Sequence, residues 1–440
     1  MISTRKIALS ILNKFDSKKE KIPVLIKNTL NSIKLSKNEK NRIKVSVNEV
    51  VRYRGILDSI IESGSKKKIK YIQPKLKNVL RLGIYELLFD DLIPDFAAIH
   101  SSVELAKKAV NRRSGSMVNA VMRNIQRYHE KHGDWKNSLF ENSIELAYPK
   151  WLIKKWQKQF GIQNTKKLCS FLIKKAPIYL RLNESKLSED NMFSYFNKMD
   201  IEVSKHSNFK NFFKITSGKE KIFDTEIFKN GLISIQDPAS GAVVDLIEPK
   251  HGDIILDACA APGTKSLFMA QRVGLNGKIY ASDKNIKRVN KGALDIERHN
   301  YKNIQWSTLD ATKDDFPKFK KILIDAPCTG TGAIGRRPDI KWRLREEDIK
   351  RMSELQKHIL EHMAKFLLPK GKLVYSTCSL EEEENEEVVN EFLKKRPDFK
   401  LLVTHSLLPD QWVNSKGFMF AVPYKTKTDG LFAAVLQKQA

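Results

Sequence analysis

The chain has 440 residues, 41% of them hydrophobic, and a formal net charge of +28. This length exceeds one ordinary domain, so we expect two or three domains with packed cores. The excess of Lys and Arg indicates a polyanionic partner, nucleic acid before an anionic membrane, with a lysine-rich solubilising surface as the alternative. No apolar run approaches the roughly 18–20 residues that cross a bilayer, which argues against a membrane-spanning helix.

The cysteine content and the start of the chain indicate a cytoplasmic location. The four cysteines include no CxxC pair, which argues against a disulfide framework and against a zinc cluster. Arg5 and Lys6 precede a short apolar stretch that Ser10 and Asn13 interrupt, and no small-residue cleavage site follows. This pattern predicts an amphipathic helix and not a signal peptide.

Residues 1–135 are predicted to form an all-α domain. Apolar residues recur there at three- and four-residue spacings, and β-type runs are few. A turn at Pro94 separates two helices, and a later helix is predicted to end near Gly133. Positive charge is densest in this part of the chain, and its sharpest cluster is SKKKIKYIQPKLK at residues 65–77.

The rest of the chain is predicted to form a small α+β segment, residues 145–235, and an α/β domain, residues 236–440. In the first, YPKWLIKKWQKQFG is typical of a helix with Pro149 in its first turn, and IYLRLNESK is typical of a strand. In the second, strands alternate with stretches long enough for helices, which predicts a doubly wound parallel sheet. The five strand candidates are DIILDACAAPG, GKIYASDKN, KNIQWSTLD, KKILIDAPC and GKLVYSTCS.

Acidic residues lie at the ends of the first three of these strands, where an open parallel sheet binds its ligand. Asp257 and Asp283 close the first and second strands, and Asp310 follows the third. A helix N-cap or a solvated loop could explain any one of them, but three together favour a binding site. The first turn has a single glycine, Gly263, in place of GxGxxG, and the sequence has no GxxxxGK[ST] loop. S-adenosylmethionine, which has a ribose but no phosphate, is therefore favoured over dinucleotides and nucleoside triphosphates.

Two cysteines are predicted at the ends of the fourth and fifth strands. Cys328 follows Asp325 and Pro327, and Cys378 follows Thr377. If these strands are neighbours, the two thiols face each other across the cofactor cleft; the alternative is two small buried core residues. A metal site is disfavoured because the PCxxC and HxE sequences of zinc deaminases are absent. A redox dithiol is also disfavoured, because the cysteines of such a motif are normally two residues apart in the sequence.

A thiol beside a methyl donor suits methylation of cytosine at C5, because thiolate addition at C6 turns the ring into a reactive enamine. Asp325 near N3 would stabilise this adduct, and Lys265 would help to lower the pKa of the attacking thiol. The glutamates at residues 381–384 are interpreted as favourable charge at a helix start. Beyond the fourth strand, five residues would supply positive charge for the phosphates of RNA and an aromatic ring for base stacking: Arg336, Arg337, Lys341, Trp342 and Arg343.

These motifs resemble the RNA 5-cytosine methyltransferase family (NOL1/NOP2/Sun). The matching stretches are DACAAPGTKS, DAPCTGTG, RRPDIKWR, YSTCSLEEEENEEVV and TDGLFAAVL. The helical part, RLGIYELLFDDLIPDFAAIHSSVELAKK followed by VNAVMRNI, resembles a NusB-like RNA-binding domain. A NusB-like domain joined to a Rossmann-like S-adenosylmethionine-dependent methyltransferase domain is the arrangement of the branch that acts on bacterial small-subunit ribosomal RNA. The resemblance covers nearly the whole chain and is weakest at residues 185–230.

By this resemblance, Cys378 is the nucleophile, Cys328 assists product release, and Asp325 lies between cofactor and base. Asp283 would bind the ribose, and Asp310 the adenine edge. The choice of Cys378 over Cys328 rests on the resemblance alone, because DNA 5-cytosine methyltransferases attack with a Pro-Cys cysteine. The loop that binds the methionine side of the cofactor would comprise Cys259, Ala260, Ala261, Pro262, Gly263, Thr264 and Lys265.

One departure from the family lies in this loop, where Thr264 replaces the second glycine of APGGK. If that position needs a positive φ, a threonine there is strained. The resemblance otherwise implies methylation of C5 of a specific cytidine in 16S rRNA, free or in an assembling small subunit. Apart from the resemblance, we expect a monomer without a metal. Two alternatives stay open: the same chemistry on tRNA, and a non-catalytic RNA-binding or antitermination factor with a vestigial catalytic domain. The intact cysteines and acids count against the second alternative.

Overall fold

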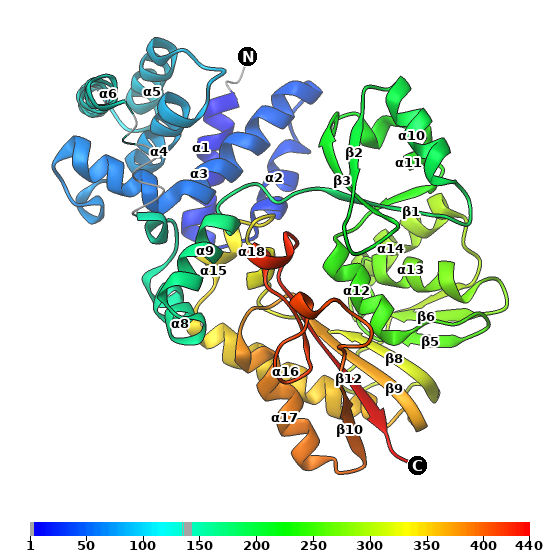
Figure 1. The fold of residues 1–440 in the computed structure, drawn as a ribbon. Coiled ribbons are helices and arrows are strands. Elements are labelled where there is room, and N and C mark those ends of the chain that lie inside the picture. Colours follow the sequence, from blue (N-terminus) through cyan, green and yellow to red (C-terminus); the bar gives the residue numbers. More distant parts are fainter. Residues whose placement is uncertain (1–3, 134, 136–142) are drawn as a thin grey trace. The chain divides into compact units, whose positions relative to one another are not determined.

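The computed structural model describes residues 4–133, 135 and 143–440, which belong to two compact units (Figure 1). One unit comprises Met1–Lys174 and Ile334–Leu344, and the other comprises Lys175–Ala333 and Arg345–Ala440. The chain therefore leaves the second unit after Ala333, adds a short segment to the first unit, and returns. Within the described ranges, no helix is both long enough and apolar enough to cross a bilayer.

The first unit is helical, as predicted. Ser36 begins α3 with a capping box that includes Glu39, and Pro74 lies in the first turn of α4, where its missing N–H leaves no helical bond unmade. The predicted helix boundaries near Pro94 and Gly133 are confirmed, because α5 begins after Pro94 and α6 ends before Gly133. The elements are α1 (Thr4–Lys18), α2 (Ile22–Leu30), α3 (Lys37–Ser65), η1 (Ile69–Tyr71), α4 (Pro74–Phe89), α5 (Asp95–Ala109), α6 (Arg112–His132), η2 (Ile144–Ala147), α8 (Lys150–Phe160), α9 (Ile162–Leu172) and α15 (Asp339–Arg343).

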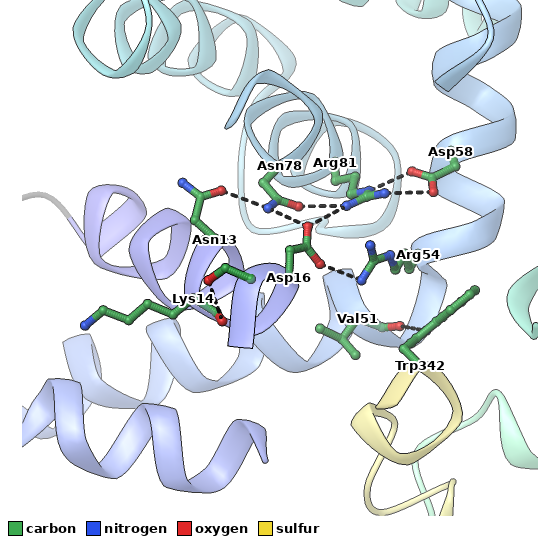
Figure 2. A network of polar contacts seen from close by, with 10 residues as sticks. Asn13, Lys14, Asp16, Val51, Arg54, Asp58, Asn78, Arg81 and Trp342 are labelled. Carbon is green, nitrogen blue, oxygen red and sulfur yellow. Dashed lines mark hydrogen bonds and ion pairs between the residues drawn. The ribbon is translucent and has the colours of Figure 1, made fainter. Parts of the chain in front are cut away.

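A network of polar contacts ties α1, α3 and α4 together inside this unit (Figure 2). The Arg81 guanidinium donates to both carboxylate oxygens of Asp58, at 2.6 and 2.8 Å. It also donates to Asp16, which forms a second ion pair with Arg54 at 2.7 Å. Because Arg81 is only 3% exposed, these hydrogen bonds offset the cost of burying its charge. The network fixes the relative positions of three helices.

The segment Ile334–Leu344 packs against α3 of the same unit. The Lys341 ammonium nitrogen lies 2.9 Å from the carbonyl oxygen of Arg52 and 4.1 Å from the centroid of the Tyr148 ring. The indole nitrogen of Trp342 donates to the carbonyl oxygen of Val51 at 2.8 Å (Figure 2). Since Lys341 is 0% exposed, the prediction that it contacts RNA phosphates is wrong, and the Trp342 nitrogen is likewise used inside the protein.

The second unit begins with a small antiparallel sheet in the order β2-β3-β1-β4. Helix α10 contributes Phe196 to an apolar core with Leu180 and Phe213 from the sheet. This region is part of the predicted α+β segment, and its first strand lies within the predicted stretch IYLRLNESK. The elements are β1 (Tyr179–Leu182), α10 (Glu189–Lys198), β2 (Glu202–Lys205), β3 (Phe212–Ser217), η3 (Ile222–Asp224), α11 (Glu226–Lys229) and β4 (Ile233–Ile235).

A larger sheet follows in the order β10-β12-β9-β8-β5-β6-β7, with β11 paired to β12. The five predicted strands form its parallel part, and β12 joins β9 in the antiparallel direction. The predicted Rossmann-like α/β class is therefore confirmed. The strands are β5 (Ile254–Asp257), β6 (Lys278–Ser282), β7 (Ile304–Ser307), β8 (Phe319–Asp325), β9 (Leu367–Thr377), β10 (Phe399–Leu402), β11 (Met419–Ala421) and β12 (Leu431–Lys438).

Helices cover both faces of this sheet (Figure 1), because successive strand residues point to opposite sides. Ile255 and Leu323 share one core with residues of α12 and α13, whereas Leu256 and Ile322 share another with residues of α16 and α17. The helical elements are α12 (Pro238–Ile247), α13 (Thr264–Val273), α14 (Ile286–His299), η4 (Thr331–Ala333), α16 (Glu346–Ala364), η5 (Glu382–Glu384), α17 (Glu386–Lys395), η6 (Asp410–Trp412) and α18 (Pro423–Thr426).

Candidate active site

Cys328 and Cys378 lie side by side at the carboxyl ends of the neighbouring strands β8 and β9. Their sulfur atoms are 3.1 Å apart. The two strands stay in parallel register up to Asp325 and Ser376, so the chain leaves both at the same edge of the sheet. The predicted meeting of the two thiols is confirmed. Both residues are partly exposed, in contrast to the fully buried Cys169, so they are not core cysteines.

The glycine-rich run after Cys328 packs tightly against the end of β9. The N–H of Gly332 donates to the carbonyl oxygen of Cys378 at 3.0 Å, and its carbonyl oxygen accepts from the N–H of Gly430 at 3.0 Å. A Cβ atom on Gly332 would lie 2.1 Å from the carbonyl oxygen of Gly430. Any side chain at this position would therefore push the Cys328 loop away from Cys378.

Asp325, at the tip of β8, forms an ion pair beside the cysteines. The Lys265 ammonium lies 2.6 Å from Oδ2 of Asp325, and the hydroxyl of Ser376 donates to Oδ1 at 3.0 Å. Burial alone would lower the pKa of Lys265, but the adjacent Asp325 carboxylate outweighs burial and raises it. Lys265 is therefore held as a cation beside Asp325.

The environment of Cys328 favours its neutral thiol. The hydrogen bond with Cys378 and burial of the sulfur raise the pKa of Cys328 well above its usual value. The carboxylates of Glu384 and Asp325 add to this shift, because a nearby negative charge disfavours a thiolate. Cys328 consequently keeps its proton at neutral pH.

The loop from Cys259 to Lys265 joins β5 to α13 and is held by backbone hydrogen bonds. The N–H of Ala260 donates to the carbonyl oxygen of Ser282 at 2.8 Å, which ties the loop to the end of β6. The N–H of Gly263 donates to the carbonyl oxygen of Ala260 at 2.7 Å, which closes a tight turn. Burial raises the pKa of Cys259, so this thiol is neutral.

Thr264 is accommodated without the strain that the sequence raised. The residue in the left-handed region is Gly263, with φ +102°, and a Cβ atom there would lie 2.9 Å from the Trp306 ring. Thr264 is the first residue of α13, and its φ is not positive. The loop therefore needs a glycine at position 263 and tolerates a threonine at position 264.

Two carboxylates flank this loop at the ends of β6 and β7. Asp283 is 4% exposed, accepts from the N–H of Asn285 at 3.0 Å, and pairs with Arg288 at 3.0 Å. Asp310 is partly exposed; burial would raise its pKa, but hydrogen bonds from Thr312 lower it. Acceptor groups at both strand ends fit a ligand that offers hydroxyl and amino donors, and they disfavour a phosphate.

Asp257, the first of the three predicted strand-end acids, has a different environment. It is 0% exposed, and the hydroxyl of Ser266 donates to its Oδ2 at 2.6 Å. Burial is the main cause that raises the pKa of Asp257 to about 7. Its hydrogen bond with Ser266 links β5 to α13, so Asp257 helps to hold the loop that joins these two elements.

Residues 381–384 lie at the start of η5, in line with their interpretation as helix-start charge, but this does not account for the burial of two of the four glutamates. Glu381 and Glu384 are both 0% exposed, and Glu384 contacts residues next to both cysteines. A local sequence does not distinguish this buried glutamate from its solvated neighbours, because all four positions have the same residue type. Gln356 and Ser376, which contact the same region from α16 and β9, were missed for a similar reason.

The described residues contain no group of three or more His, Cys, Asp or Glu side chains arranged to hold a metal ion. The site thus consists of two adjacent thiols, an ion pair and acceptor carboxylates around a glycine turn. Such an arrangement can supply a nucleophile, a neutral thiol and a charged pair to one reacting centre.

Comparisons with known proteins agree with this architecture. Residues 244–437 match the model of the 16S rRNA methyltransferase RsmB/F family. Residues 2–127 match the NusB family, and residues 148–219 match the ferredoxin-like domain of RsmF/B-like methyltransferases.

Individual relatives match over most of their length. A probable ribosomal RNA small subunit methyltransferase B of Bacillus subtilis is 32% identical over 99% of this chain and 99% of its own. The ribosomal RNA small subunit methyltransferase B of Vibrio vulnificus is 31% identical over 89% of each chain. The crystal structure of a methyltransferase homolog protein from Pyrococcus horikoshii, 30% identical, covers 68% of this chain and 99% of its own with a TM-score of 0.60. The chain therefore belongs to the ribosomal RNA small subunit methyltransferase B family.

Proposed function

We propose that the protein methylates C5 of a specific cytidine in 16S rRNA through a covalent adduct between Cys378 and C6 of the base. The observation that carries this proposal is the pair of sulfur atoms 3.1 Å apart, beside the ion pair of Lys265 and Asp325. Two thiols at one reacting centre suit a reaction in which one bond to carbon forms and is later broken. Membership of a ribosomal RNA methyltransferase family supports the choice of substrate.

S-adenosylmethionine is the proposed cofactor, and it supplies the methyl group when bound. The loop of residues 259–265 would hold its methionine side, Asp283 its ribose hydroxyls, and Asp310 its adenine edge. The carboxylates at the ends of β6 and β7 support this choice, because they suit hydroxyl and amino donors and not phosphates. The proposed domains are residues 1–135 and 145–235, which would add basic surface for RNA, and residues 236–440, which would hold the cofactor.

The residues of the cleft have distinct proposed roles. Cys378 attacks C6 of the base and is expelled again after methyl transfer. Asp325 faces N3 and stabilises the adduct, with the Lys265 ammonium beside it as a source of a proton. Cys328, which keeps its proton in the resting protein, assists the expulsion of Cys378 after the methyl group and the C5 proton have been exchanged.

Two cysteine variants test these roles. Cys378→Ala should abolish methylation, because no other residue is assigned to the attack on C6. Cys328→Ala should accumulate a covalent protein–RNA adduct that is visible on a denaturing gel. The reverse result, an adduct with Cys378→Ala and none with Cys328→Ala, would exchange the two roles.

Bisulfite sequencing of total RNA from a deletion strain tests the substrate. We expect one cytidine of 16S rRNA to lose its protection from deamination when the gene is absent, and to regain it when the gene is restored. Loss of protection in tRNA with intact 16S rRNA would overturn the proposed substrate and favour a tRNA methyltransferase. No change in any RNA would overturn the enzymatic function itself.

A further inference from the structure

The buried carboxylate of Glu384 accepts hydrogen bonds from two loops at once. Glu384 ends the turn η5 and is 0% exposed. Its Oε2 accepts from the backbone N–H of Thr329 and from the side-chain amide of Gln356, each at 2.9 Å. Its Oε1 accepts from the hydroxyl of Ser379 at 2.5 Å and from the hydroxyl of Thr329.

These partners lie directly beside the two cysteines. Thr329 follows Cys328 in the chain, and Ser379 follows Cys378. A single carboxylate therefore joins the residue after one cysteine to the residue after the other. Gln356 adds a further link, because its amide also donates to the carbonyl oxygen of Pro327 at 2.9 Å.

Further hydrogen bonds of Glu384 and of the next residue, Asn385, fix the position of the carboxylate. The hydroxyl of Tyr375 donates to the carbonyl oxygen of Glu384 at 2.6 Å. The next residue, Asn385, accepts from the hydroxyl of Thr377 at 2.5 Å and donates to the carbonyl oxygen of Ser379 at 3.0 Å. These hydrogen bonds hold the Glu384 carboxylate at the end of β9, next to Cys378. The same carboxylate connects this end of β9 to the Cys328 loop.

A purely structural role accounts poorly for a carboxylate here. Among the described residues, no Lys or Arg forms a salt bridge with Glu384, and burial raises its pKa despite the donors around it. Burying a carboxylate without a cation costs stability, whereas an apolar core residue would not. The negative charge does act on chemistry, because it is one of the causes that disfavour the thiolate of Cys328.

We propose that Glu384 is a positioning residue for the proposed C5 methylation: it holds the Cys328 loop against the end of β9 and keeps the Cys328 sulfur as a thiol donor beside Cys378. This inference rests on the proposed function. Glu384 itself contacts neither the base nor the cofactor in this role. It acts through Thr329, Ser379 and Gln356 on the two sulfur atoms.

The first experiment measures alkylation of Cys328 by iodoacetamide as a function of pH, without RNA, with peptide mass spectrometry as the readout. Glu384→Gln keeps the volume but removes the charge, so Cys328 should be alkylated at lower pH than in the unmodified protein. Glu387→Gln is the matched control, because Glu387 is an exposed glutamate of the same segment, and its profile should not move. An unchanged profile for Glu384→Gln would overturn the proposed effect on the thiol.

The second experiment compares kcat and KM for RNA in the same variants. Glu384→Gln should lower kcat by about tenfold or more, because a small misplacement of a reacting group has a large effect on rate. Its KM for RNA should stay within about twofold, since Glu384 is proposed to contact neither the base nor the cofactor. Equal losses in Glu384→Gln and Glu387→Gln, or a change in KM alone, would overturn the positioning role.

A third variant keeps the test decisive if Glu384→Gln fails to fold. Ser379→Ala removes one donor to the carboxylate and leaves the charge in place, so it should lower kcat by a smaller factor without shifting the alkylation profile. Normal kcat in Ser379→Ala would overturn the inference. If no C5 methylation occurs in any variant, the proposed function fails, and the alkylation profile still reports whether Glu384 controls the Cys328 thiol.

Discussion

Two lysines that are largely removed from solvent, one in each unit, have pKa values that shift in opposite directions. Lys265 has a side chain 11% exposed and pairs with Asp325 at 2.6 Å, and this carboxylate raises its pKa against the effect of burial. Lys341 is 0% exposed and has no carboxylate partner among the described residues; burial and the nearby Arg52 hold its pKa well below the usual value. Burial therefore acts in the same direction on both lysines, and the pKa rises only where a carboxylate lies beside the ammonium. The presence of a carboxylate partner, and not the extent of burial, decides the direction in which the pKa of each lysine shifts.

The largest effect is expected from removing the paired cation. Lys265→Met leaves Asp325 without its ammonium beside the reacting base, so the rate of methyl transfer should fall by about 100-fold or more. Lys265→Arg should retain part of the activity, because a guanidinium restores the ion pair in a different shape. Single-turnover methylation of 16S rRNA measures both. Full activity in Lys265→Met would show that the ion pair has no part in the reaction.

A smaller effect, on stability instead of rate, is expected at the unpaired lysine. Lys341→Arg should destabilise the helical unit by about 3 kcal/mol, because a larger group that always stays charged would be buried without a carboxylate partner. Lys341→Met should cost much less, since an apolar chain of similar length places no charge in the buried site. Hydrogen exchange of the α3 amides under increasing urea measures the difference. Equal stability of the Arg and Met variants would contradict the lowered pKa of Lys341.

Asp257 extends the comparison to an acid, whose effect on stability depends on pH. Its pKa is raised from 3.8 to about 7, mainly by burial, so the folded protein binds a proton there that the unfolded chain releases. Stability is then complete below pH 3.8 and falls as pH rises towards about 7. Asp257→Asn should remove this part of the pH dependence. The measurement is Tm against pH for both proteins, at about 2–4 °C per kcal/mol for a unit of this size; parallel curves would contradict the raised pKa.

Much of the catalytic unit could be predicted because its signals are local. Apolar runs mark the strands, and Asp257, Asp283 and Cys378 stand where those runs end. Parallel strands bring their carboxyl ends to one edge, so the meeting of Cys328 and Cys378 followed from the order of the strands. Local signals also predicted helix boundaries in the helical unit, because Pro94 and Gly133 mark the start and the end of helices there.

The features that escaped prediction depend on contacts between distant parts of the chain. RRPDIKWR has the charge and the ring of an RNA-binding segment, yet Lys341 bonds a carbonyl oxygen 289 positions earlier. Burial of a lysine is contrary to its usual preference, so composition predicts the opposite of what occurs. Glu384 escaped for a related reason: among four consecutive glutamates, its burial depends on hydrogen bonds to Thr329 and Gln356, which lie outside the motif.

The segment Ile334–Leu344 also determines where the chain can be divided. It begins shortly after Cys328 in sequence, but it belongs to the helical unit. A fragment that starts after Lys174 would keep Lys341 and Trp342 and lose the carbonyl groups of Arg52 and Val51 that they bond. Deletion of the N-terminal part would thus leave the side chains of Lys341 and Trp342 without these hydrogen-bond partners. The helical unit is for this reason a part of the folded enzyme that recombination or truncation cannot simply remove, in contrast to a domain attached through a linker at one end.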